Sequence, residues 1–189
     1  MRPAVCIPIL SLLLASFVQS KLAWGDAVVQ RSIDAEKSTV QFTISHIFVE
    51  RVSGTIPILK GTIDLPGGSS LPLSATAVLD VTKLDSGDRD RDASLQSPNY
   101  FDVKKFPEWT FASTRIVASG PSAFGMDGML TIHGVMQPER LDVTILGDAS
   151  HPRYHATGRI DRRTFNLKGT RLDPVIGTFA DVTLDIVLK

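Results

Sequence analysis

The stretch Ser38–His46, with the sequence STVQFTISH, places an apolar side chain at every second position. Val40, Phe42 and Ile44 fall on one face of an extended strand, and the polar residues between them fall on the other face. The same period of two recurs in four further segments, at residues 71–81, 141–145, 154–160 and 182–188. Such alternation is typical of antiparallel strands that have one buried face.

Turn residues divide much of the remaining chain into strand-sized pieces. Turn sequences at residues 66–68, 119–121 and 133–134 accompany three further candidate strands at residues 51–65, 109–117 and 124–132. A count of about eight short strands with almost no helix favours an all-β barrel or sandwich. Pro57 cannot donate a hydrogen bond to a neighbouring strand, so the second strand should bend, bulge or lie at an edge there.

One charged segment, residues 85–97, interrupts the alternation and contains no β-branched residue. Asp85 or Ser86 can cap the start of a helix, and Leu95 is the one strong apolar anchor in the segment. The sequence therefore predicts a short helix over about residues 86–96.

The first 27 residues have the features of a secretory signal peptide. A single early charge, Arg2, precedes an apolar stretch from Val5 to Val18, which is shorter than the roughly 20 residues of a membrane span. Small residues suited to cleavage follow at Ala23, Gly25 and Ala27. We expect residues 1–27 to be removed and residues 28–189 to form one domain in the periplasm or outside the cell. An uncleaved amphipathic anchor is the alternative.

Composition excludes two classes of function. Lys plus Arg and Asp plus Glu both number 20, and a chain without a basic excess is a poor match for nucleic acid, which is bound by clustered cations. The only cysteine, Cys6, lies in the expected leader. The domain therefore has no disulfide and no thiol chemistry, and its stability must come from a core.

The usual signatures of metal binding and catalysis are missing from the sequence. The four histidines have neither HExxH spacing nor a Cys/His cluster, so we expect no metal site. Asp88 resembles the start of a calcium loop, but Ala93 and Asn99 stand where that loop needs glycine and glutamate. There is no Gly-x-Ser-x-Gly elbow. We expect no catalytic residues and no cofactor.

Several segments together resemble the YceI-like family of polyisoprenoid-binding proteins. They are Ser38–His46, Val52–Thr55, Arg91-Asp92 with Leu95 and Ser97, Tyr100–Asp102 with Lys105–Pro107 and Thr110-Phe111, and Gly128–Val135 with Pro138 and Leu141–Val143. These matches follow in order from about Ile33 to Val187. Two positions depart from the family pattern: Ser94 replaces a frequent histidine, and Ile56 replaces the usual phenylalanine.

The resemblance implies a lipocalin-like, eight-stranded antiparallel barrel with an apolar tunnel for an isoprenoid chain, frequently in periplasmic proteins. It makes the chain a binding or carrier protein for a polyprenyl or quinone-type lipid, and not an enzyme. A small enzyme in the same cavity, or a packed barrel acting as a stress-related protein-interaction module, are the alternatives. Transient contact with a membrane or membrane protein, and a homodimer, stay open.

Candidate ligand-binding residues are aromatic or aliphatic positions within the predicted strands, with two polar residues for the head group. The tunnel candidates are Phe42, Ile44, Leu73, Leu79, Trp109, Phe111, Met126 and Leu130. Arg91 could pair with a charged head through its guanidinium fork, and His46 could meet a head group at the barrel mouth. The plainer interpretations are a solvated helix in which Asp and Arg neutralise each other, and a hydrogen-bonded rim histidine.

Overall fold

The computed structural model describes residues 27–46, 50–167 and 175–189. Nearly all of the predicted signal peptide lies outside the described residues and stays a prediction. Within the described ranges, no helix has the length and apolar character needed to cross a membrane.

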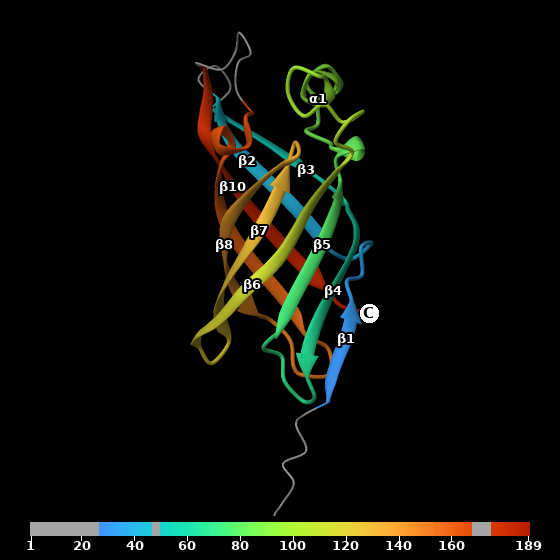
Figure 1. The fold of residues 1–189 in the computed structure, drawn as a ribbon, viewed down its shortest axis with the longest axis vertical. Helices are drawn as coiled ribbons and strands as arrows, with labels where there is room; N and C mark the ends of the chain where they lie inside the picture. The colour runs from blue at the N-terminus through green and yellow to red at the C-terminus, as the bar shows by residue number, and fades with distance from the viewer. Residues whose placement is uncertain (1–26, 47–49, 168–174) are drawn as a thin grey trace, which may run out of the picture.

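The described chain forms one antiparallel sheet with a single α-helix (Figure 1). The strands are β1 Val28–Ser32, β2 Thr39–His46, β3 Glu50–Thr55, β4 Ile58–Pro66, β5 Ser74–Asp80, β6 Glu108–Gly120, β7 Ala123–Ile132, β8 Val135–Ile145, β9 Arg153–Asp161 and β10 Ile176–Val187. The helices are α1 Arg89–Gln96 and two short 3₁₀ turns, η1 Val81–Lys83 and η2 Arg162–Phe165. The order of strands in the sheet is β1-β4-β5-β6-β7-β8-β9-β10-β2-β3.

The all-β, antiparallel class is confirmed, but the prediction of eight strands is wrong, because the described chain contains ten. One addition is β1, whose VVQRS sequence is mostly exposed and lacks the alternation that the prediction relied on. The other arises because the predicted strand at residues 51–65 is two strands, β3 and β4, which are separated at Ile56 and Pro57. The strand that was expected to bend, bulge or lie at an edge at Pro57 is therefore interrupted there.

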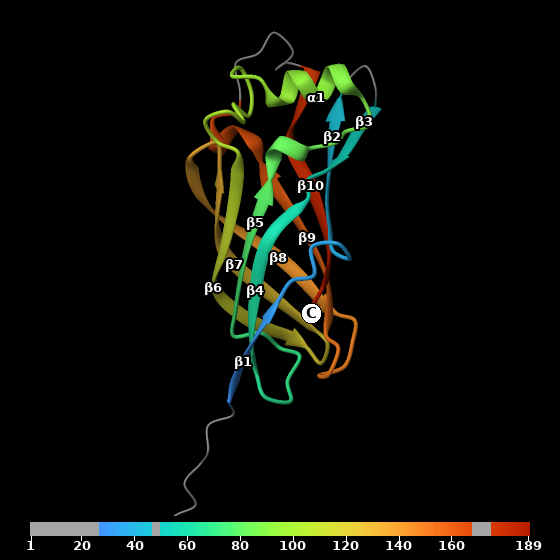
Figure 2. The ribbon, with the colours of Figure 1, turned by 90° about the vertical axis from the view of Figure 1, so that its right-hand side faces the viewer.

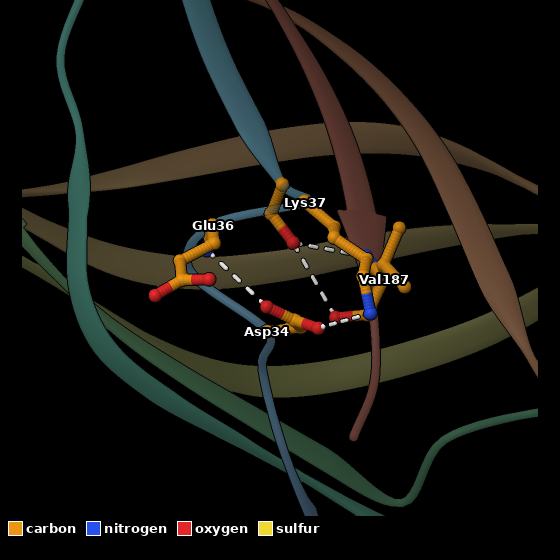
Figure 3. Close-up of polar contacts among 5 residues, drawn as sticks. Asp34, Glu36, Lys37 and Val187 are labelled. Atoms are coloured by element: carbon orange, nitrogen blue, oxygen red, sulfur yellow. Dashed lines mark hydrogen bonds and ion pairs between the residues drawn. The ribbon is translucent and has the colours of Figure 1, made fainter.

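The sheet closes on itself because the first strands of the chain, β1 and β2, lie beside its last strand, β10. Ile33 forms an antiparallel bridge with Leu188, and the Asp34 N–H donates to the Val187 carbonyl at 2.8 Å. The Asp34 carboxylate also accepts from the Glu36 N–H and pairs with Lys37 Nζ at 3.0 Å (Figure 3). The tight turn after β1 is therefore fastened to the end of β10.

The result is an elongated barrel with α1 across one end and β1 toward the other (Figure 2). Two clusters of buried side chains fill it. The lower cluster, toward β1, includes Ile63, Leu65, Phe124, Met126 and Tyr154. The upper cluster, toward α1, includes Val81, Tyr100, Phe101, Trp109 and Phe165.

The predicted helix is present, but its expected cap is wrong. Asp88 is the N-cap, and its carboxylate accepts from the N–H groups of Asp90 and Arg91, both at 3.0 Å. Ser86 instead binds the side chain of Asp92. Gly87 has a φ of +76°, so the chain turns between these residues and the helix begins later than predicted.

Candidate functional site

An apolar cavity of about 110 Å³ lies in the middle of the barrel, between the two clusters. Its wall takes side chains from β2, from every strand between β5 and β10, and from Ile56 at the β3–β4 break. It therefore touches most of the circumference of the barrel, and its lining is almost entirely hydrocarbon.

Five of the ten predicted ligand residues line this cavity: Phe42, Leu79, Trp109, Phe111 and Leu130. They come from β2, β5, β6 and β7, so the fold brings together positions that the sequence keeps far apart. Their role in ligand binding stays a prediction.

The other three tunnel candidates lie elsewhere. Met126 is buried in the lower cluster, and Ile44 is half-buried on β2, on the same face as Phe42. Leu73 is 55% exposed. It shares the parity of Ala75 and Leu79, but it precedes the start of β5, so strand alternation does not govern where its side chain lies.

The two polar candidates lie apart from the cavity. His46 is half-buried at the end of β2 and lies on the same face of the strand as Ile44, two residues before it. The Arg91 guanidinium forks onto Ser86, donating from Nε to the hydroxyl at 2.8 Å and from a terminal nitrogen to the carbonyl at 2.6 Å. In this structure Arg91 therefore anchors α1 to the preceding loop.

The cavity is short compared with the long tunnel that the resemblance implies. An engineered cavity of about 150 Å³ admits benzene, so the volume here holds only a few carbon atoms. Residues of both the upper and the lower cluster contribute to the cavity wall. A longer chain would need side chains of one cluster to move or a second way out of the barrel.

Trp109, which lines the cavity, carries an unsatisfied polar atom. Its Nε1 is the one buried side-chain nitrogen or oxygen without a hydrogen bond among the described residues. The indole packs edge-on against Phe101, with ring centroids 4.8 Å apart. Leaving such a donor unpaired costs about 1–3 kcal/mol.

Glu139 is the residue that sequence reasoning missed. The odd-numbered side chains of β8 are the more buried ones, and Glu139 shares this parity with Leu141 and Val143. Burial, with the Asp161 carboxylate as a second cause, raises the pKa of Glu139 above its usual value. The described residues offer it no hydrogen bond or ion pair. A polar residue on the inward face hides this half of β8 from a search for alternating apolar residues.

Residues 27–46, 50–167 and 175–189 contain no group of three or more His, Cys, Asp or Glu side chains placed to hold a metal ion.

A profile of the YceI-like domain matches residues 32–188. The chain belongs to the YceI-like family. This confirms the resemblance in the sequence, and the match runs from the last residue of β1 to Leu188.

Relatives of similar length support the assignment. Protein YceI of Escherichia coli is 28% identical over 173 residues, covering 87% of this chain and 90% of the relative. A UPF0312 protein of Vibrio campbellii is 27% identical over 153 residues, covering 80% of each.

Two solved structures share the YceI-like fold at low sequence identity. Burkholderia cenocepacia BcnA superposes with a TM-score of 0.74 at 21% identity, covering 83% of this chain and 99% of its own. A polyisoprenoid binding domain from Saccharophagus degradans has a TM-score of 0.67 at 16% identity, covering 84% and 97%. At these identities the likeness establishes the fold.

Proposed function

We propose that this protein binds an isoprenoid or similar long-chain lipid, with part of the tail in the mid-barrel cavity. The observation that carries the proposal is an apolar cavity lined by β2 and by β5 to β10 inside a YceI-like barrel. The polyisoprenoid-binding description of the Saccharophagus degradans domain supports the same ligand class.

The cavity gives the binding energy a natural source. Each buried CH₂ contributes about 0.8 kcal/mol, and ordering the tail offsets part of that gain. Phe42, Phe111 and Leu130 offer broad apolar contact with no polar group to desolvate. The lining favours a hydrocarbon tail over a polar substrate, and with it binding over catalysis.

The biological setting belongs to the proposal as well. With residues 1–27 as a leader, the barrel would act in the periplasm as a soluble carrier for a lipid that water does not dissolve. Fractionation of cells producing the full chain tests this: the processed protein is expected in the periplasmic fraction, and an unprocessed protein in the cytoplasm would contradict it.

Quenching of Trp109 fluorescence by a short-tailed prenyl quinone tests binding directly, in a Trp24→Phe background. Ala77 lines the cavity, so Ala77→Leu fills part of it and should weaken binding by roughly tenfold, the effect of about 1–2 kcal/mol of overpacking. Ala112→Leu, on the exposed face of β6, is the matched control and should bind like the parent. Equal affinities for the two variants would place the quinone outside the cavity.

A packed barrel acting as a protein-interaction module is the second candidate, because the two clusters fill most of the interior. Native mass spectrometry of freshly purified protein separates the two. Co-purifying lipid supports the carrier, whereas a ligand-free protein that also fails to quench with the quinone supports the packed module.

A further inference from the structure

The barrel wall is incompletely paired between β8 and β9. Pairing between these strands runs only from Ile145 opposite Tyr154 to Leu141 opposite Gly158. Both strands continue beyond this point, β8 toward Val135 and β9 toward Asp161. Pairing of β7 with β8, by contrast, extends along the whole length of β8.

Pro138 explains part of this gap. The Ile145 N–H donates to Ser122, on the β7 side, and the Leu146 N–H donates to Arg153, on the β9 side. Because hydrogen-bonding direction alternates along a strand, even-numbered residues of β8 face β9. Pro138 therefore lacks an N–H at a position that would donate to β9.

Electrostatics explain the rest. Continued register would set Arg140 opposite Arg159, and like charges directly opposite each other are destabilising. Each arginine instead contacts residues of the strand on its other side, β7 for Arg140 and β10 for Arg159. Arg140 pairs with Asp127 on β7 at 3.0 Å, and Arg159 lies near Asp181 and over the Phe179 ring on β10.

A groove of about 720 Å³, with a lining of mixed polar and apolar character, runs along the outside of this gap. It shares Glu139, Arg140 and Val182 with the apolar cavity, so these residues form the partition between the two spaces. Both arginines are held against other strands. Glu139 is therefore the charged residue of the partition that belongs to the more buried, odd-numbered set of β8.

We infer that the lipid reaches the outside through the gap between β8 and β9, and that the Glu139 carboxyl hydrogen-bonds an uncharged oxygen-bearing head group there. This rests on the proposed function and deepens it. A hydroxyl or carbonyl head suits a carboxyl that has no hydrogen-bond partner among the described residues. A phosphate head would meet the carboxylates of Glu139 and Asp161, while Arg140 and Arg159 are already paired. The gap also gives a tail longer than the cavity a way out.

Three ligands with the same carbon skeleton test the head-group site: geranylgeraniol, geranylgeranyl diphosphate and the hydrocarbon phytane. Wild type should bind the alcohol more tightly than the other two. Glu139→Leu should lose about threefold to tenfold in affinity for the alcohol, the worth of one hydrogen bond, with little change for phytane. Glu108→Gln, at an exposed carboxylate at the start of β6, is the control and should match wild type.

The outcomes separate this inference from the proposed function. If phytane and the alcohol bind with equal affinity in wild type and in Glu139→Leu, lipid binding stands and the head-group site is wrong. If His46→Ala removes the preference for the alcohol while Glu139→Leu retains it, the head lies at the α1 end and the inference is overturned. If none of the three ligands binds, the proposed function itself fails.

Discussion

Gly128 shows how a single missing side chain shapes the cavity. A Cβ at this position of β7 would lie 2.3 Å from Cζ of Phe111 and 2.8 Å from the carbonyl oxygen of Ala112. The Phe111 ring, which lines the cavity, therefore rests directly against the backbone of β7. Glycine permits that approach, and the position of the ring sets the width of the cavity.

Gly128→Ala should accordingly lower the free energy of unfolding by about 1–3 kcal/mol, because either the ring or the neighbouring strand must shift. Urea denaturation measures the change. Gly67→Ala is the control, because its Cβ would approach nothing closer than the Ala27 carbonyl at 3.4 Å, and it should stay within about 0.5 kcal/mol of wild type. Equal losses in the two variants would show that the contact with Phe111 is unimportant.

At the scale of elements, α1 is a weakly packed piece of the fold. None of its residues is fully buried, although Leu95 packs against the upper cluster, and polar contacts also hold the helix in place. These are the Asp88 cap, the Arg91 fork onto Ser86, and a hydrogen bond from Gln96 to the Thr82 carbonyl at 3.1 Å. An element held in this way can open without unfolding the barrel.

Asp88→Ala should therefore speed hydrogen exchange of the α1 amides while the β-sheet amides keep their protection. Loss of an N-cap destabilises a helix by about 0.5–2 kcal/mol. Here it lowers the free energy of local opening of α1 by that amount. Arg89→Ala removes an exposed side chain of the same helix and should leave exchange near wild type. Faster exchange across the whole sheet would mean that α1 and the barrel unfold together.

The strands and the helix also differ in how well the sequence predicts them. The alternation at Ser38–His46 and at 154–160 marks β2 and β9 because each buries one apolar face. The first half of β8 was not predicted as a strand, because Gln137 and Glu139 occupy the inward face, where the alternating pattern requires apolar residues. The N-cap at Asp88 was not predicted, because it depends on the turn at Gly87, which residue preferences alone do not locate.

For the whole molecule, hydrogen-bonded aspartates at turns and strands tie stability to pH. The pKa of each lies below the usual aspartate value of 3.8; they are Asp34, Asp64, Asp80, Asp88 and Asp148. A carboxyl with a lowered pKa in the folded state contributes stability above its unfolded pKa. That contribution is lost as the pH falls through the folded value. The free energy of unfolding should therefore decline below about pH 4.

Asp64 offers a specific test of this decline. Its pKa is lowered first by the Ser74 hydroxyl, which donates at 2.6 Å, and then by Gln30. Ser74→Ala keeps the carboxyl but removes its strongest donor, so the slope of unfolding free energy against pH below about pH 4 should be shallower than in wild type. Urea titrations at a series of acid pH values measure it, and an unchanged slope would refute the assignment.

The sequence predicts the class of the whole molecule better than its interior. Period-two alternation is a local property, so the all-β fold could be inferred from short segments. The strand count and the cavity depend on contacts between distant segments, such as the Ile33–Leu188 bridge. The cavity likewise needs lining residues from β2 and from β5 to β10, which no single segment encodes.

The position of β10 between β9 and β2 also has a consequence for folding kinetics. β10 pairs with both β9 and β2, so a nascent chain cannot complete its barrel until β10 has been synthesised. Pairings between such remote segments close slowly, typically in milliseconds to seconds. The newly made polypeptide therefore passes through a stage in which β2 has an open edge, and that edge is where a chaperone or another copy of the chain would first engage it.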